Sequence, residues 1–220
     1  MQFVQADTQR AYEQVREKIV TLKLEPGALI NEQHLAKELD MGTAPVREAL
    51  KLLVHDDLVV VTRRHGLYVA DINIPDLEQL SEVRLSLESL CARLAAQRAG
   101  SDDLSVLEAL RQQQAAIPAD DSPRLFDLDQ KFHRALVQAA NNKYLARILE
   151  HLFGLSKRLW YMALPSMDFL PAFVAEHLDL IEAIKSKDAD RAEQIMHHHV
   201  KGFYDRVREV LSQKSPNETG

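Results

Sequence analysis

Apolar residues near the start of the chain recur at intervals of three and four, which is the spacing of one buried helix face. The pattern predicts three short helices, at residues 8–22, 31–39 and from 43 onward. Asn31 and Thr43 stand where the side chains that cap helix N-termini are expected. Because only residues 40–42 separate the last two helices, the sequence predicts a helix followed by a helix-turn-helix.

The pattern then changes to two short runs rich in β-branched and aromatic residues, 58–62 and 67–70. Between them lies Arg63-Arg64-His65-Gly66, in which Gly66 can adopt the positive φ angle that a tight hairpin requires. A basic-tipped hairpin after a helix-turn-helix predicts a winged helix-turn-helix, whose second helix enters the major groove of DNA. The alternative, a small helical domain with a surface hairpin, leaves the basic tip without a packing purpose.

After Pro75 the strand signals stop, and apolar residues at helical spacing continue to about Leu211. Glycine, proline and capping residues divide this stretch into six helices, an arrangement typical of an antiparallel bundle. The third, fifth and sixth helices are expected at about 122–140, 169–185 and 188–211. The fold class is therefore mainly α. The expected domains are a winged helix-turn-helix at 1–74, an all-α domain at 75–211 and a flexible tail at 212–220.

Composition excludes several classes of protein. The chain of 220 residues is 46% hydrophobic and 27% charged with only 7 Gly and 8 Pro, which excludes collagen-like, low-complexity and wholly disordered chains. The longest aliphatic run, residues 58–61, is far too short to cross a bilayer, so a cytoplasmic protein without a membrane partner is expected. The single cysteine, Cys91, is in step with Leu87 and Leu94 on an apolar helix face, and we expect it to be buried.

The net charge limits how the chain could contact DNA. With 27 Lys and Arg against 33 Asp and Glu, the net charge is −6, which argues against non-specific coating of nucleic acid. Contact with DNA must then depend on local placement. The pairs Arg47 with Lys51 and Arg63 with Arg64 are the candidates.

Four polar residues fall on helix faces that should form the bundle core. Asp129 and His133 lie one turn apart in the third helix, and His177 is in phase with the apolar face of the fifth. The apolar register of the sixth helix selects His199 out of the run 197–199. His177 and His199 each lie 11 residues from Asp188, near the predicted turn, so in an antiparallel hairpin they face each other at one level.

Three imidazoles and one carboxylate in the core suggest a metal site. Buried polar groups without partners cost a few kcal/mol each, and joint coordination of one divalent ion removes that cost. Nitrogen and oxygen donors suit zinc best, with nickel, cobalt or manganese as alternatives. The simpler interpretation is a set of hydrogen-bonded core histidines. Arg84, four residues before Glu88, is either half of a surface ion pair or a clamp for the carboxylate of an effector.

These features together resemble GntR-superfamily transcriptional regulators of the FadR subfamily, whose C-terminal domain is of the FCD kind. Six bundle helices resemble its VanR-like branch. The matching motifs are Asn31-Glu32, Leu35-Ala36, Ala44-Pro45-Val46-Arg47-Glu48-Ala49-Leu50, Arg64-His65-Gly66 with Val69, Arg84 with Glu88, Asp129 with His133, Asn142, Glu176-His177 and His199. One departure is the segment Asp40-Met41-Gly42-Thr43-Ala44, where the family usually has Gly-Val-Ser-Arg-Thr. An arginine that often contacts DNA is therefore missing.

The resemblance implies a function and a set of sites. Such regulators bind palindromic operators as dimers and respond to a small organic or sugar acid at a metal-containing bundle. The candidate DNA-contacting residues are Gln33, Thr43, Arg47, Arg63, Arg64, His65 and Gly66. The candidate metal ligands are Asp129, His133, His177 and His199, and Arg84 is the candidate effector contact. The first and fourth bundle helices, rich in leucine, are the candidate homodimer interface.

Two other functions are compatible with these residues. A metal-dependent hydrolase could use the same four ligands to activate water, although no separate general base stands beside them and the winged domain would have no purpose. A regulator with a purely structural metal and an acyl-CoA or fatty-acid effector is the second. We expect a regulator and not an enzyme.

Overall fold

The computed structural model describes residues 2–62 and 66–214, and the chain forms two compact units. One unit comprises residues 1–73 with 154–162, and the other comprises 74–153 with 163–220. In the described part of the chain, no helix is both long enough and apolar enough to span a membrane.

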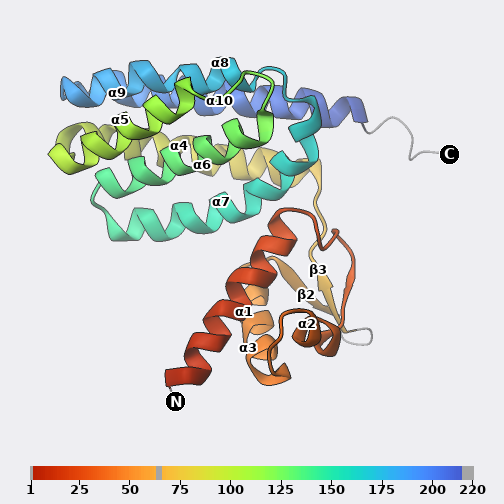
Figure 1. Ribbon diagram of the computed structural model, residues 1–220. Helices are drawn as coiled ribbons and strands as arrows, with labels where there is room; N and C mark the ends of the chain where they lie inside the picture. The colour runs from red at the N-terminus through yellow and green to blue at the C-terminus, as the bar shows by residue number, and fades with distance from the viewer. Residues whose placement is uncertain (1, 63–65, 215–220) are drawn as a thin grey trace. The chain divides into compact units, whose positions relative to one another are not determined.

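The first unit is a winged helix-turn-helix (Figure 1). Its helices are α1 (Gln2–Val20), α2 (Glu32–Glu38) and α3 (Thr43–His55), and its strands are β1 (Leu29–Ile30), β2 (Val59–Thr62) and β3 (Gly66–Val69). The inner faces of the helices and strands form one apolar core that includes Val15, Ile19, Leu35, Leu50, Leu53 and Val69. This core fixes the angle between α2 and α3, and so it leaves the outer face of α3 exposed to solvent.

The turn between α2 and α3 is tight because its ends are well defined. Asn31 caps α2 by accepting a hydrogen bond from the backbone N–H of His34 at 3.0 Å, as the sequence predicts. Asp40 reverses the chain after α2 with a φ angle of 51°, a left-handed conformation that aspartate tolerates better than most residues. The expected cap of α3 is wrong: Gly42 is the N-cap and Thr43 is already the first helical residue.

The predicted hairpin of β2 and β3 is present, and β1 adds a third strand, so the wing is a three-stranded antiparallel sheet. Strand β3 is central, paired with β2 on one side and with β1 on the other. β1 has only two residues, too few for an alternating pattern to be detected in the sequence. Gly66 has a φ angle of 102°, the positive value expected of it. Arg63, Arg64 and His65 lie outside the described residues.

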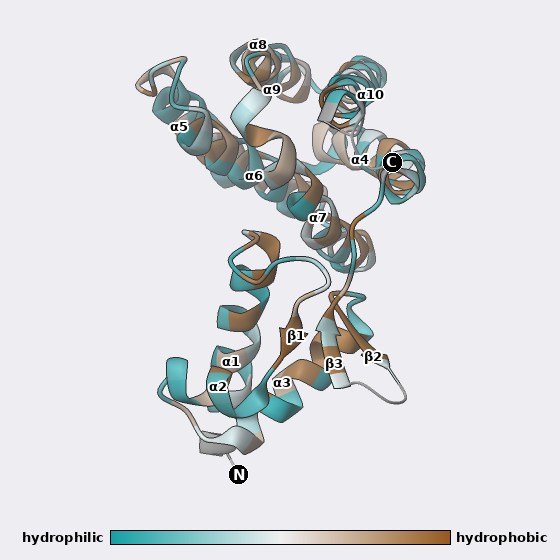
Figure 2. Cartoon of the chain, turned by 90° about the vertical axis from the view of Figure 1, so that its right-hand side faces the viewer, coloured by the Kyte–Doolittle hydropathy of each residue, from teal (hydrophilic) through white to brown (hydrophobic). Residues whose placement is uncertain are grey.

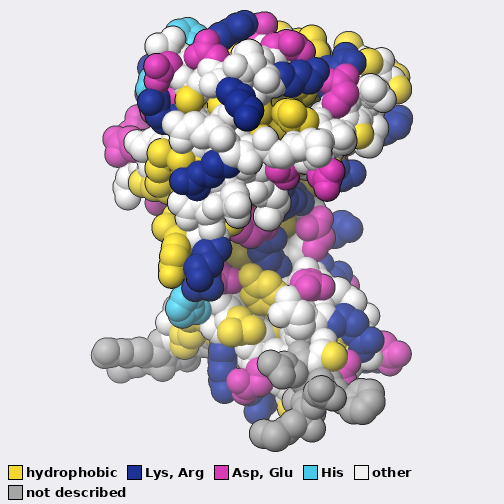
Figure 3. Space-filling view, turned by 90° about the vertical axis from the view of Figure 1, so that its left-hand side faces the viewer, with side chains coloured by type: hydrophobic (Ala, Val, Ile, Leu, Met, Phe, Trp, Pro, Cys, Tyr) yellow, Lys and Arg dark blue, Asp and Glu magenta, His cyan; other side chains and the backbone are white. Residues whose placement is uncertain are grey.

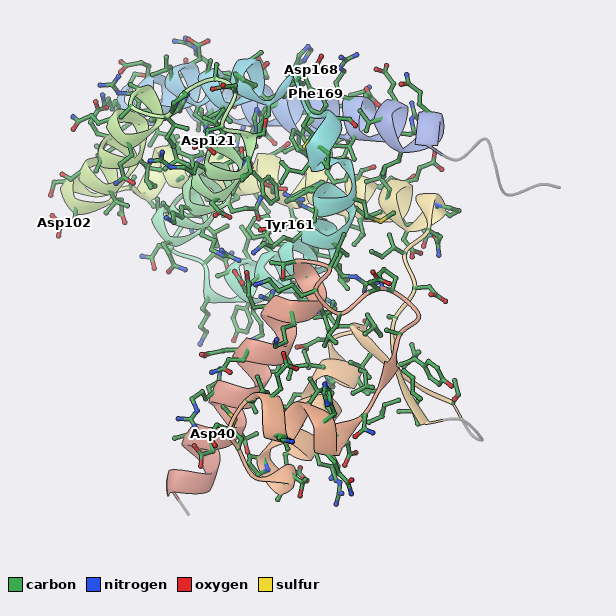
Figure 4. All side chains as sticks on the ribbon, turned by 45° about the vertical axis from the view of Figure 1, so that its right-hand side comes forward. Asp40, Asp102, Asp121, Tyr161, Asp168 and Phe169 are labelled. Atoms are coloured by element: carbon green, nitrogen blue, oxygen red, sulfur yellow. The ribbon has the colours of Figure 1, made fainter. Side chains whose placement is uncertain are left out.

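The second unit is an all-α bundle (Figure 1). Its α-helices are α4 (Ile74–Arg98), α5 (Ser101–Ala115), α6 (Ser122–Ala139), α7 (Lys143–Ala163, of which residues 154–162 belong to the first unit), α8 (Leu170–Ala175), α9 (His177–Lys185) and α10 (Ala189–Lys214), with a short 3-10 helix, η1 (Leu164–Ser166). Figure 2 shows that α10 carries hydrophobic residues on one side and hydrophilic residues on the other. Asp121 caps α6, the helix of the first two candidate metal ligands (Figure 4).

Two helices of the bundle differ from the sequence prediction. The predicted fifth helix is divided at Glu176 into α8 and α9, and Phe169, where that helix is expected to begin, is the N-cap of α8 (Figure 4). The described residues after 73 therefore hold seven α-helices and not six. The last helix continues to Lys214, three residues past its predicted end. Residues 215–220 of the expected tail lie outside the described part.

Candidate functional site

Helix α3 has one buried face and one exposed face. Val46, Ala49 and Leu53 are fully buried, whereas Arg47, Glu48 and Lys51 point outward on the opposite side. The outward face could therefore contact DNA. Gln33 of α2, Thr43 and Gly66 are also exposed.

The basic residues on this face already have partners in the same unit. Arg47 Nε donates a hydrogen bond to Glu32 Oε2 at 2.9 Å, and Lys51 Nζ donates to Glu48 at 2.8 Å. Both pairs are largely exposed, and ion pairs in water are worth under about 1 kcal/mol. A DNA phosphate or base could replace either partner at little cost. On the face drawn in Figure 3, basic and acidic side chains are interspersed.

The four predicted metal ligands meet inside the second unit. Asp129 and His133 come from α6, His177 is the first residue of α9, and His199 lies in α10. Each is at most 5% exposed, and one potential ligand atom from each lies within 4.8 Å of the others. His177 and His199 face each other across α9 and α10, as the sequence predicts, with ring centroids 5.0 Å apart. The neighbouring residues His197 and His198 are exposed, so the predicted register of α10 is confirmed.

Asp129 lies at the centre of this cluster. Its Oδ1 is 3.4 Å from His177 Nε2 and 3.7 Å from His133 Nε2. Gln130 Nε2 donates to the other carboxylate oxygen at 3.4 Å. His177 is stacked on Phe132 with ring centroids 3.8 Å apart, which fixes the plane of its imidazole. Two imidazole nitrogens therefore point toward one carboxylate oxygen.

The arrangement fits a bound cation better than a set of hydrogen bonds. His177 Nε2 is buried and has no hydrogen-bond partner among the described residues, and the distances to Asp129 Oδ1 are long for hydrogen bonds. An unsatisfied buried nitrogen costs about 1–3 kcal/mol unless another group binds it. Three nitrogens and one oxygen are the donor set of zinc and of several other transition metals.

Two glutamates contact the outer nitrogens of two of the histidines, and the sequence pattern does not predict them as part of the site. Glu88 Oε2 lies 2.6 Å from His133 Nδ1, and Glu176 Oε2 lies 2.9 Å from His199 Nδ1. In the sequence both residues stand out only as parts of motifs, Arg84 with Glu88 and Glu176-His177. Their role depends on the packing of α4 and of the α8–α9 junction against other helices, which helical periodicity does not report.

Arg84 lies in the interior beside Glu88. Its Nε donates to Glu88 Oε1 at 2.7 Å and its Nη1 donates to Tyr204 Oη at 2.9 Å, while the guanidinium stacks over the Phe153 ring. The side chains of Arg84 and Glu88 are 3% and 2% exposed, so the surface-pair interpretation is wrong. Arg84, Glu88 and His133 form a continuous chain of polar contacts from α10 to the cluster.

Burial and neighbouring charges shift several pKa values here. Burial raises the pKa of Glu88, but the Arg84 guanidinium and His133 outweigh it and lower the pKa to about 2. Burial and the two other imidazoles hold the pKa of His177 well below its usual value, so this ring is neutral and able to bind a metal. Burial lowers the pKa of His133, but the carboxylates of Asp129 and Glu88 outweigh it and raise the pKa.

Comparison with known proteins identifies the family. The model of the FCD domain matches residues 79–202, more than half of the chain, and that of the bacterial regulatory proteins of the gntR family matches residues 7–69. The chain belongs to the GntR family of regulators with an FCD domain. The gntR match covers α2, α3 and the wing, and the FCD match contains all four candidate ligands.

Relatives and solved structures agree with this GntR assignment. The chain is 28% identical over 208 residues to the HTH-type transcriptional repressor RspR of Escherichia coli K12, covering 94% of this chain and 91% of the relative. It is 27% identical over 198 residues to the repressor GlaR of the same strain, covering 86% and 90%. The structure of E. coli McbR/YncC has a TM-score of 0.79 at 21% identity, covering 95% and 99%, and shows the same fold.

The family assignment decides between regulator and enzyme. GntR proteins and the named relatives are transcriptional regulators, so this chain is a regulator and the hydrolase alternative is dropped. The VanR-like branch stays a prediction.

Proposed function

We propose that this GntR regulator binds a palindromic operator as a homodimer and changes its DNA affinity when a small organic or sugar acid binds at a metal centre in the FCD domain. The observation that carries the proposal is the convergence of Asp129, His133, His177 and His199 within 4.8 Å in a chain that also holds a winged helix-turn-helix. A DNA-binding domain and a buried set of candidate metal ligands in one chain are what a ligand-responsive regulator requires. Since it acts on DNA, we expect it in the cytoplasm.

The proposed metal is a divalent ion, zinc first, with nickel, cobalt or manganese as alternatives. The four converging side chains would hold it, and a bound ion would attract the carboxylate of an acid effector. Arg84 is the proposed second contact for that acid. Because the Arg84 guanidinium now contacts Glu88 and Tyr204, the acid would have to share or replace one of these contacts. This requirement favours compact acids that can approach both groups.

The proposed DNA contacts are Arg47 in the major groove, with Gln33 and Thr43 beside it and the wing residues 63–66 on phosphate or in the minor groove. A palindromic site requires two recognition helices related by a two-fold axis, and one chain supplies one such helix. Apolar side chains stand exposed on the two helices proposed as the dimer interface. They include Val83 and Leu90 on α4, 46% and 39% exposed, and Ile148 on α7, 48% exposed.

The test combines metal analysis with DNA binding. Metal content is measured by mass spectrometry for the purified protein and for His199→Ala, with His198→Ala as the exposed neighbouring control. Each protein is then titrated into a fluorescent operator duplex with and without a panel of organic and sugar acids. We expect His199→Ala to lose the metal and the acid response together while keeping DNA binding, and His198→Ala to keep all three.

Two results would contradict the proposal. Loss of the metal from His198→Ala but not from His199→Ala would refute the assigned ligand set. A DNA response to acyl-CoA or fatty acids, in a protein whose metal is retained but whose affinity no small acid changes, would instead favour the structural-metal alternative.

A further inference from the structure

In the cluster of Asp129, His133, His177 and His199, two of the three histidines contact a glutamate through the ring nitrogen Nδ1. Glu88 Oε2 is 2.6 Å from His133 Nδ1, and Glu176 Oε2 is 2.9 Å from His199 Nδ1. We propose that Glu88 and Glu176 are positioning residues that keep His133 and His199 in the tautomer that can bind the ion. The inference rests on the proposed function, because it requires a metal at the cluster.

The tautomer follows from which groups can donate a hydrogen bond. An ionised carboxylate only accepts, so the Nδ1 atom that it contacts must carry the proton. A neutral imidazole has one N–H, and the Nε2 lone pair of each ring then remains available to an ion. The Nε2 atom of His133 does face the cluster, since it lies 3.7 Å from Asp129 Oδ1. The two glutamates therefore select the metal-binding nitrogen in each ring.

Glu88 is held more rigidly than Glu176. Its other oxygen, Oε1, accepts from Arg84 Nε at 2.7 Å and lies 2.6 Å from Arg84 Nη2, so the guanidinium fixes which oxygen faces His133. The Glu176 side chain is 47% exposed at the division between α8 and α9. It directly precedes His177 in the chain, so its contact with His199 also joins the start of α9 to α10.

The substitution Glu88→Gln tests the tautomer directly. Arginine can only donate, so the oxygen of the new amide must face Arg84 and its NH2 group must face His133. His133 Nδ1 then has to accept, which moves the ring proton to Nε2 and blocks the metal-binding nitrogen. The variant is close to the wild type in shape, so the effect on the metal is chemical and not a loss of volume.

The experiment measures zinc affinity by competition with a chromogenic chelator and the ring tautomers by ¹⁵N NMR of the histidines in metal-free protein at alkaline pH, where the imidazoles are neutral. We expect Glu88→Gln to weaken zinc binding by roughly 10- to 100-fold or more and to move the His133 proton from Nδ1 to Nε2. Glu176→Gln, which can turn in solvent, should weaken zinc binding by less. Glu176 also provides the test if Glu88→Gln fails to fold, because its side chain is half-exposed.

The matched control is Glu182→Gln on α9, whose exposed carboxylate contacts Lys185 and no ligand. It should change neither zinc affinity nor any tautomer. Zinc affinity within twofold of the wild type in both Glu88→Gln and Glu176→Gln, with the His133 and His199 tautomers unchanged, would overturn the inference. If the wild type itself binds no zinc, nickel, cobalt or manganese, the proposed metal centre fails and the positioning role fails with it.

Discussion

Removal of the Arg84 guanidinium should destabilise the FCD domain far more than an ordinary helix ion pair would. In Arg84→Met the volume is nearly kept, but Glu88 loses its main counter-ion while it stays 2% exposed. A buried carboxylate without a partner is costly, whereas loss of an exposed pair is almost neutral. The loss of stability in Arg84→Met therefore distinguishes a buried ion pair from the exposed pair that the spacing of four residues suggests.

The magnitude can be worked from Glu88. Burial raises its pKa, but Arg84 first and His133 second lower it from 4.5 to about 2. This lowering corresponds to about 3 kcal/mol at ~1.4 kcal/mol per pKa unit, within the range of roughly 3–5 kcal/mol for breaking buried pairs. Because the pKa is lower in the folded state, the stabilisation is complete above about pH 4.5 and is lost as the pH falls toward 2.

The assay is urea unfolding at pH 8 with a chelator present, monitored by far-UV circular dichroism. Hydrogen exchange of the α4 amides identifies which transition belongs to the second unit. We expect Arg84→Met to lose about 3 kcal/mol. The control is Lys201→Met, which breaks the exposed pair of Lys201 with Asp205, also four residues apart, and should cost under about 0.5 kcal/mol. Adding Glu88→Gln to Arg84→Met should recover stability, because the buried carboxylate that has lost its counter-ion is then removed. An equal loss in Arg84→Met and Lys201→Met would refute the reasoning.

Three further predictions concern other parts of the chain. Burial raises the pKa of the Cys91 thiol, so Ellman's reagent should not react with the native protein at pH 8 but should release one equivalent in guanidinium; rapid reaction of the native protein would contradict this burial. Arg47→Ala should reduce the preference for operator over random duplex by about 1–3 kcal/mol in competition titrations, and an unchanged preference would remove α3 as the reading helix. Analytical ultracentrifugation should show a homodimer that Ile148→Asp weakens, and a monomeric wild type at micromolar concentration, with and without operator, would exclude the proposed assembly.

The parts of the fold that the sequence predicts are those that depend on a long periodic signal. Apolar residues at intervals of three and four run through α6 and α10, and so they place Asp129, His133 and His199 on the inner faces. The register also separates His199 from the two exposed histidines before it, since one residue turns a helix by about 100°. These three members of the cluster were therefore predictable from helical periodicity alone.

The parts that the sequence does not predict depend on contacts between distant segments. β1 has two residues and exists only because β3 pairs with it. Glu88 is one of many charged residues on α4, and nothing in its spacing tells that α6 and α10 cover it. Glu176, where the predicted helix is divided, keeps an ordinary helical backbone conformation. The sequence therefore has no helix-breaking residue at this position. In each case the partner, and not the local propensity, decides the structure.

The pairing of α4 with α10 affects when the FCD domain can form during synthesis. Arg84 and Tyr204 are 120 residues apart and yet hydrogen-bond to each other, so the first and last helices of the domain close its core together. A nascent chain at 5–20 residues per second spends roughly 6–24 s between translating these two positions. During that interval the apolar side of α4 and its Arg84–Glu88 pair lack the cover that α10 provides. A chaperone can therefore bind α4 of the growing polypeptide during this interval. In any chain truncated before Tyr204, α4 stays exposed in the same way.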